Sequence, residues 1–278
     1  MTQVIAIGTV IYHPTEKLVL RLLAAVSAGY CVYVFDNSPD HAMIRNLCHD
    51  MQNDRIKYLT CGKNVGLGYA LSSICAQAYY DSFPALLFFD QDTVFDRSTL
   101  AFVAEFYSHN SCDLGSYSAI VFNSTQFGAT GFVGKYAFND VVLAINSGSL
   151  YLLDNVRKIK WHNESFFVDC VDFEFCLRSS NSNMRIGECA NAPGYNHEIE
   201  QGSIQYLFFG KELRARAYPF GRLVDSARAG LRLLITSIYA GNMRCTGAIG
   251  TSMMKFFVVQ LLVRVLNPQD RRRDCDEV

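Results

Sequence analysis

The chain has 278 residues, of which 50% are apolar and 18% are charged, and its formal net charge is −1. This length can bury a large core, in one large domain or in a domain with an appendage, and the apolar fraction excludes a disordered chain. The ten cysteines are irregularly spaced and lack a paired CxxC or a Cys/His zinc pattern. We therefore expect free thiols in a reducing cytoplasm, and oxygen ligands for any metal. No charged-then-apolar leader opens the sequence, which predicts that the protein is not exported.

The first part of the chain predicts a strand-helix-strand unit. Val4–Ile11 is β-rich, and Pro14 punctuates the turn that follows it. The next apolar residues have helical spacing, at Leu18, Leu22, Leu23 and Val26. Cys31–Phe35 then has the pattern of a second strand.

Asp36 directly follows this second strand, where an open α/β sheet places its functional groups. Its carboxylate is suited to accept a hydrogen bond from the imide N–H of a pyrimidine base or from a ribose hydroxyl. The alternative is an Asx-turn that only starts the turn at Ser38-Pro39. The sequence leaves both interpretations open.

Glycines at 66 and 68 follow a third short strand, Ile56–Leu59, and open a helical segment that runs through Tyr79. Glycine lets a backbone approach a ligand closely at a helix N-terminus. The spacing matches neither GxGxxG after the first strand nor GxxxxGK[ST], so neither a dinucleotide-binding fold nor a P-loop NTPase is supported.

The apolar run Ala85–Phe89 predicts a strand buried on both faces, and it ends in two carboxylates, Asp90 and Asp92. Two carboxylates at i and i+2 can turn toward one hard divalent cation. Acidic pairs also start turns, and Asp96 is placed to cap a following helix. Because strands and helices alternate up to this point, we expect a mostly parallel, doubly wound sheet.

A second acidic cluster lies in Phe166–Arg178, after a stretch from Ala119 to Leu153 that predicts antiparallel strands shaping a pocket. In a helix, Asp169 and Asp172 share one face, whereas Glu174 lies well around from them, four residues before an arginine. Carboxylates among aromatic side chains have raised pKa values, which suits a general base. The alternative is a helix N-terminus enriched in acids for dipole reasons.

The segment Cys189–His197 has the pattern of a loop. An isolated histidine such as His197 is more often structural than a ligand, although its imidazole is able to complete a metal site.

The C-terminal portion is basic, since Arg214–Arg273 contains 11 Lys+Arg against 2 Asp+Glu. In the helix predicted from Arg222 to Tyr239 a cationic face opposes an aliphatic one formed by Val224, Ala227, Leu231, Leu234 and Ile238. The run Met253–Leu266 is interrupted by charged and polar residues and is expected to fall short of a bilayer span. We therefore expect peripheral docking on an anionic membrane, with a merely solvated helix face as the alternative. Nucleic acid is disfavoured because the basic residues lack interleaved stacking aromatics.

An ordered set of motifs resembles the inverting GT-A glycosyltransferases of family 2, and most of all the bacterial rhamnosyltransferases of O-antigen and polysaccharide assembly. These motifs are Tyr12-His13-Pro14, Asp36-Asn37-Ser38, Asn64-Val65-Gly66-Leu67-Gly68, Asp90-Gln91-Asp92, Asn146-Ser147-Gly148-Ser149 and Val171–Arg178. The resemblance covers Val4 to His197. It implies an α/β GT-A fold with a mostly parallel doubly wound sheet, antiparallel additions and a C-terminal helical extension.

The resemblance also implies roles for individual residues. Asp92 would bind Mn²⁺ or Mg²⁺, with His197 as a candidate ligand, and Asp172 would be the base, with Asp169 in reserve. The acceptor side would be formed by Ser147, Gly148 and Glu174. The nucleotide-sugar site would be formed by Thr9, Tyr12, Asp36, Asn64, Gly66, Gly68, Asp90 and Gln91. The family's usual Glu-Asp is Val171-Asp172 here, so only the second acid is present.

The implied organisation is a catalytic domain at 1–210, with a nucleotide-binding half at 1–100 and an acceptor half at 101–210, followed by a basic amphipathic helical extension at 211–278. The implied activity is transfer of L-rhamnose from dTDP-L-rhamnose onto a lipid-linked oligosaccharide, in bacterial surface polysaccharide synthesis at the cytoplasmic face of the cell membrane. A UDP-hexose donor is one alternative. A catalytically silent membrane scaffold of the same fold is another.

Overall fold

A computed structural model of the chain describes residues 4–39, 54–124, 134–197, 204–208, 211–215 and 217–266. The chain divides into two compact units, Met1–His197 and Glu198–Val278. The predicted assignment of a nucleotide-binding half and an acceptor half within the catalytic part stays a prediction.

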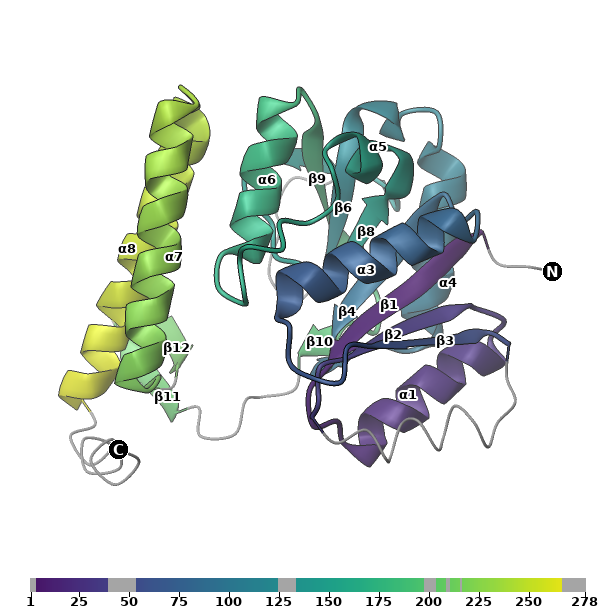
Figure 1. Ribbon diagram of the computed structural model, residues 1–278, viewed down its shortest axis with the longest axis horizontal. Coiled ribbons are helices and arrows are strands. Elements are labelled where there is room, and N and C mark those ends of the chain that lie inside the picture. The colour runs from purple at the N-terminus through teal and green to yellow at the C-terminus, as the bar shows by residue number, and fades with distance from the viewer. Residues whose placement is uncertain are drawn as a thin grey trace. The chain divides into compact units, whose positions relative to one another are not determined.

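The first unit is built on a sheet of eight strands in the order β3-β2-β1-β4-β8-β6-β9-β7 (Figure 1). The strands are β1 (Ile5–Ile11), β2 (Val32–Asp36), β3 (Ile56–Thr60), β4 (Ala85–Asp90), β6 (Tyr117–Ser124), β7 (Asn139–Val141), β8 (Ser149–Leu152) and β9 (Arg185–Ala192). The pairs β3-β2, β2-β1, β1-β4 and β6-β9 are parallel. The pairs β4-β8, β8-β6 and β9-β7 are antiparallel. A mostly parallel sheet with antiparallel additions, as predicted, is therefore confirmed.

Helices cover both faces of this sheet (Figure 1). The helices α1 (Glu16–Ser27) and α4 (Arg97–Asn110) enclose one core with the sheet, to which Ile7, Val34 and Phe89 contribute from successive strands. The helix α3 (Leu67–Tyr80) packs on the other face and against α5 (Leu153–Lys158), and α6 (Val171–Asn181) packs on β9. The burial of strand residues on both faces explains why β1, β2 and β4 are continuous apolar runs.

Local differences from the sequence-based expectations have clear causes. The predicted loop Cys189–His197 contains the end of β9 and the short strand β10 (Asn196–His197), which pairs with β5 (Thr93–Val94). A glycine and a proline in this segment mark only its middle. The helix expected to include Asp169 begins at Val171, after Cys170 adopts a left-handed conformation with φ of 64°.

The second unit contains the hairpin β11 (Ile204–Phe208) and β12 (Lys211–Ala215), and the helices α7 (Phe220–Tyr239) and α8 (Met243–Leu266). The two helices pack closely, since a methyl group on Gly230 would lie 2.2 Å from the Met253 side chain. The buried stripe of α7 is Gly230, Leu233 and Ser237. The predicted aliphatic face of α7 is therefore only partly packed, because Leu231 and Ile238 are exposed.

The helix α8 is longer than the apolar run from which it was predicted. Residues Met243–Val265 have a mean hydropathy of 1.5 and are long and apolar enough to cross a membrane by length and composition. The expectation that this segment falls short of a span was wrong on this criterion, because it began ten residues into the helix.

Candidate active site

The carboxyl ends of β2, β1 and β4 lie side by side and bring two predicted site residues to one edge of the sheet. In the strand register Asp36 pairs with Ile11, and Asp90 pairs with the adjacent Val10. This is the edge at which open α/β sheets bind their ligands. The sheet thus unites residues that lie 54 positions apart in the sequence.

Asp36 is buried, and its two carboxylate oxygens are held by protein groups. Oδ1 accepts the Ser38 N–H at 2.8 Å, and Oδ2 accepts the Tyr58 hydroxyl at 2.8 Å. The Asx-turn alternative is therefore present. Each carboxylate oxygen has two lone pairs, so these bonds orient the group and still allow a further donor such as an imide N–H.

Asp90, Asp92 and Asp172 form an acidic group at the same edge. Burial raises the pKa of Asp90 to about 7, and the negative charges of Asp92 and Asp172 add to this effect. The negative charge of Asp172 acts on Asp90, so the two acidic clusters of the sequence lie within electrostatic range of each other.

The carboxylates of this group fit a divalent cation that also uses substrate oxygens. Among the described residues, no group of three or more His, Cys, Asp or Glu side chains is arranged to hold a metal ion. Mg²⁺ and related ions are commonly bound by one or two carboxylates, with the other positions left to water and phosphate oxygens. Asp92 and Asp90 would hold such an ion, which would relieve the mutual repulsion seen in the raised pKa of Asp90.

His197 is brought next to the acidic turn by the pairing of β10 with β5. Its backbone lies opposite Thr93, the residue after Asp92. The imidazole of His197 lies outside the described residues, so its role as a metal ligand stays a prediction.

The turn that carries Asp92 is held from two sides. The Gln91 side chain accepts the Tyr12 N–H at 2.8 Å, which ties the turn to the end of β1. The guanidinium of Arg21 donates to the backbone oxygens of both neighbours of Asp92, Thr93 and, at 3.2 Å, Gln91. Gln91, predicted to contact the nucleotide sugar, thus also braces the site.

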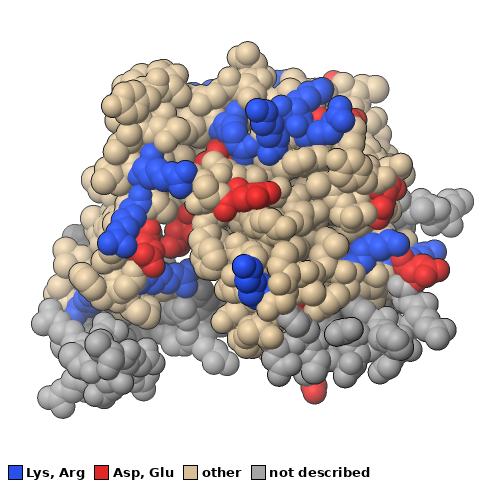
Figure 2. Space-filling view, in the orientation of Figure 1, with Lys and Arg blue, Asp and Glu red and all other residues tan. Residues whose placement is uncertain are grey.

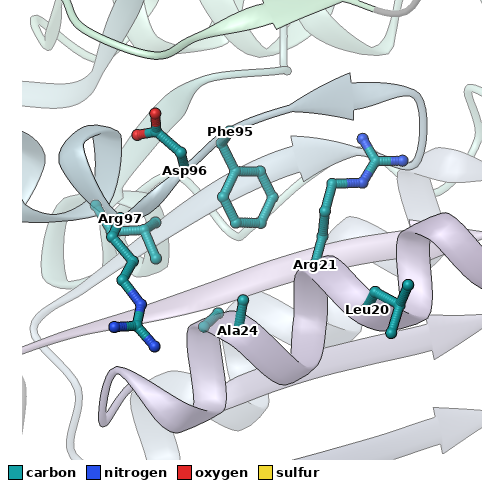
Figure 3. Close-up of a pocket in the computed structure, with 8 residues that line it drawn as sticks. Leu20, Arg21, Ala24, Phe95, Asp96 and Arg97 are labelled. Carbon is teal, nitrogen blue, oxygen red and sulfur yellow. The ribbon is translucent and has the colours of Figure 1, made fainter.

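Arg21 also borders a cavity of about 200 Å³ between α1 and the start of α4, where Phe95, Asp96 and Arg97 lie opposite it (Figure 3). None of the three carboxylates of the acidic group lines this cavity. Asp96 caps α4 through the Thr99 N–H at 3.0 Å, as the capping alternative proposed.

Ser147, predicted on the acceptor side, is buried and hydrogen-bonded to the turn that carries the acidic residues. Its hydroxyl accepts the Asp90 N–H at 3.1 Å and shares a hydrogen bond of 2.6 Å with Thr93. At Gly148, with φ of 79°, a methyl group would lie 2.6 Å from the Tyr195 hydroxyl. Ser147 and Gly148 therefore contact neighbouring protein groups and position the acidic turn.

Asp172 lies in the first turn of α6 and is half-buried. Burial raises the pKa of Asp172 to about 6, with a further contribution from the charge of Asp169 and an opposing one from the Phe173 N–H. Asp169 lies in the turn before the helix, so the two acids do not share a helix face as predicted. A carboxyl group with this pKa is suited to accept a proton near neutral pH.

Glu174 is used structurally. Its two oxygens accept hydrogen bonds from Nε and Nη2 of Arg178, at 2.9 and 3.0 Å. Oε1 also accepts a hydrogen bond from Asn163 Nδ2 at 3.0 Å. The predicted pairing of Glu174 with the arginine four residues later is confirmed. Because the carboxylate is buried and fully engaged, we assign it to holding the segment before α6 rather than to the acceptor.

The remaining predicted nucleotide-site residues differ in exposure. Tyr12 is exposed at the end of β1, and Asn64 is exposed with its side chain bonded to the Gly66 N–H at 3.0 Å. Gly66 and Gly68 are buried against other backbone. Thr9 is also buried, and its hydroxyl has no hydrogen-bond partner among the described residues.

Three supporting residues were not identified from the sequence. Arg21 is one, and Asn37 is another, because its side chain bonds both Val65 N–H and the Gly66 oxygen at 3.2 Å. Tyr195 is the third, since burial raises its pKa to about 12 and the charges of Asp90 and Asp92 contribute. Asn37 lies inside a recognised motif, whereas Arg21 carries no sequence signal beyond its place on an amphipathic helix.

The comparisons with solved structures show the fold. The chain is similar to a structure of S. aureus TarS 1-349, with 17% identity, a TM-score of 0.51, and coverage of 71% of this chain and 60% of that one. A mannosyltransferase PcManGT from Pyrobaculum calidifontis, in complex with GDP-Man and Mn²⁺, gives 12% identity, a TM-score of 0.55, and coverage of 96% and 88%. The chain thus spans less than two thirds of the TarS 1-349 structure.

A comparison with curated proteins finds no match. The sequence model of Glycosyl transferase family 2 matches residues 9–149, which is just over half of the chain and includes Asp36, Asp90 and Asp92. The sheet, the edge at which its acidic residues meet and this match agree with one another. The chain belongs to glycosyl transferase family 2 and has a GT-A fold.

Proposed function

We propose that the protein is a metal-dependent inverting glycosyltransferase that moves L-rhamnose from dTDP-L-rhamnose onto a hydroxyl of a lipid-linked oligosaccharide, in bacterial surface polysaccharide synthesis. The observation that carries the proposal is the meeting of Asp90, Asp92 and Asp172 at the sheet edge next to Asp36. Solved relatives of this fold hold UDP, UDP-GlcNAc, and GDP-Man with Mn²⁺.

Each residue has a defined task in this reaction. Asp36 accepts the imide N–H of the thymine base, held in orientation by Tyr58. Asp90 and Asp92 would hold Mn²⁺ or Mg²⁺, which supplies positive charge beside the leaving diphosphate. Asp172 takes the proton of the acceptor hydroxyl as that oxygen attacks the sugar. The base and the leaving-group site are thus formed by separate acidic clusters. This arrangement suits a displacement that inverts the configuration of the sugar.

The donor is tested by titrating the purified protein with several nucleotide sugars in the presence of Mn²⁺. We expect the tightest binding and the fastest transfer with dTDP-L-rhamnose. Tightest binding and turnover with a UDP-hexose would overturn the rhamnose assignment and leave the enzyme class intact. Absence of binding for every nucleotide sugar would instead favour a catalytically silent scaffold.

The second unit supports a membrane-side location at the cytoplasmic face. Arg222, Arg228 and Arg232 are exposed along α7. On α8 an exposed apolar stripe recurs at helical spacing, at Met254, Val258, Leu261 and Val265. Cationic residues beside exposed apolar ones suit a surface of anionic lipid. Figure 2 shows, on one face of the molecule, basic groups in small clusters together with acidic groups and wide uncharged areas.

Vesicle flotation provides the test of this location. Each cationic residue near the surface contributes about 1 kcal/mol, so the wild-type protein should float with anionic vesicles and less so as salt rises. The double variant Arg228→Ala/Arg232→Ala should bind more weakly at low salt. Equal flotation of both proteins on neutral and anionic vesicles would refute an electrostatic contact.

A further inference from the structure

The two glycines of the Asn64–Gly68 segment pack against protein backbone. At Gly68, a methyl group would lie 2.5 Å from the Asn163 backbone oxygen and 2.6 Å from that of Phe166. At Gly66, which has φ of 85°, it would lie 2.5 Å from the Phe167 backbone oxygen. Such distances are shorter than van der Waals contact allows, so only glycine permits this approach.

Hydrogen bonds join the same two segments. The Leu67 N–H donates to the Phe167 oxygen at 2.5 Å, and the Ser72 hydroxyl donates to Glu164 at 3.2 Å. The segment 163–167 leads directly into Asp169 and the first turn of α6, which carries Asp172. Asn163 is tied to that helix through its bond to Glu174.

The Asn64–Gly68 segment is fixed on its other side by Asn37, the neighbour of Asp36. Asn37 accepts the Val65 N–H and donates to the Gly66 oxygen, both at 3.2 Å. A continuous set of side-chain and backbone contacts therefore runs from the end of β2 to the segment before α6.

We propose that Gly66 and Gly68 are positioning residues, which seat the 163–167 segment on the N-terminus of α3 and so fix the acid-bearing turn against the nucleotide side of the site. This inference rests on the proposed function only for the role of Asp172. It differs from the prediction that these glycines line the nucleotide pocket, and the two assignments have opposite kinetic consequences.

Gly68→Ala is the discriminating substitution. Within a helix, alanine is more favourable than glycine by about 1 kcal/mol, so the substitution does not destabilise α3 itself. The atoms nearest to its methyl group would be the Asn163 and Phe166 oxygens of the 163–167 segment. Gly115→Ala is the matched control, because a methyl group there meets no atom within 4 Å.

We expect Gly68→Ala to lower kcat by about tenfold or more while the Kd of the nucleoside diphosphate with Mn²⁺ stays within about twofold, since small misplacement of a reacting group costs rate rather than donor binding. Ser72→Ala, which removes one bond and adds no atom, should lower kcat in the same direction but less. Gly115→Ala should leave both quantities unchanged. Weakened diphosphate binding with unchanged kcat would assign the glycines to the nucleotide pocket and overturn the proposal.

A readout independent of activity separates this inference from the proposed function. Trp161 is the single tryptophan of the chain, lies just before the seated segment, and packs on Tyr79 of α3 with ring centroids 5.6 Å apart. Gly68→Ala should shift its emission and speed hydrogen exchange of the Leu67 amide, whereas Gly115→Ala should do neither. Unchanged emission and exchange would refute the proposed packing of the 163–167 segment on α3. If both change in a protein that transfers no sugar, the proposed packing of the 163–167 segment is supported and the proposed function fails.

Discussion

Asp92→Ala should abolish turnover and greatly weaken nucleoside-diphosphate binding in Mn²⁺ or Mg²⁺. The substitution removes a predicted metal ligand, and the leaving diphosphate then lacks the positive charge that offsets its own. We expect the loss to appear both in kcat and in the Kd of the diphosphate, measured by calorimetry with and without metal.

The fold should survive this change. Asp92 is half-buried past the end of β4, and its negative charge contributes to the raised pKa of Asp90, so its removal relieves repulsion. The unfolding temperature without metal should be equal to or above that of the wild type. Asp113→Ala, at an exposed carboxylate in the same unit, is the control and should retain activity. Full wild-type activity in excess EDTA would rule out the metal mechanism.

The sheet could be predicted because its strands carry strong local signals. The runs that form β1, β2 and β4 are apolar over their whole length and end in polar residues, which fixes both the strands and the edge at which Asp36 and Asp90 meet. The electrostatic interaction between Asp172 and Asp90 has no such signal. It depends on the strand order β4-β8-β6-β9 and on the packing of α6 against β9, and strand order is a property of long-range pairing.

The packing of the glycine and serine positions could not be predicted for a related reason. Glycine next to a helix N-terminus has the same sequence pattern whether ligand or backbone fills the space, and at Gly66 and Gly68 the backbone of 163–167 fills it. Ser147 lies in a motif of small polar residues, and only the fold shows that its hydroxyl faces the Asp90 N–H. The start of α6 at Val171 likewise depends on Cys170 adopting a left-handed conformation, which helical periodicity does not reveal.

The choice of base between Asp172 and Asp169 has a direct kinetic test. Asp172→Asn keeps the size of the side chain and should leave metal and donor affinity unchanged, while lowering kcat by roughly 10²–10⁴, the usual contribution of a positioned base. Asp169→Asn should have a smaller effect, because this residue lies in the turn before α6. Near-wild-type kcat in Asp172→Asn together with a large loss in Asp169→Asn would move the role to Asp169.

The pH dependence of kcat gives a second, independent test of Asp172 as the base. Burial raises the pKa of Asp172 to about 6, and a base acts only when deprotonated, so wild-type kcat should fall about tenfold per pH unit below 6 and level off above it. Because burial raises the folded-state pKa, the protonated carboxyl of Asp172 favours the folded state. This stability is complete below the unfolded pKa and is lost as pH rises through about 6, where the buried group becomes a charged carboxylate. Asp172→Asn should therefore lose the acidic limb of the rate profile and be at least as stable as the wild type at pH 8, as measured by thermal unfolding. An acidic limb that persists unchanged in Asp172→Asn would show that another group titrates, and Asp172 would then not be the base.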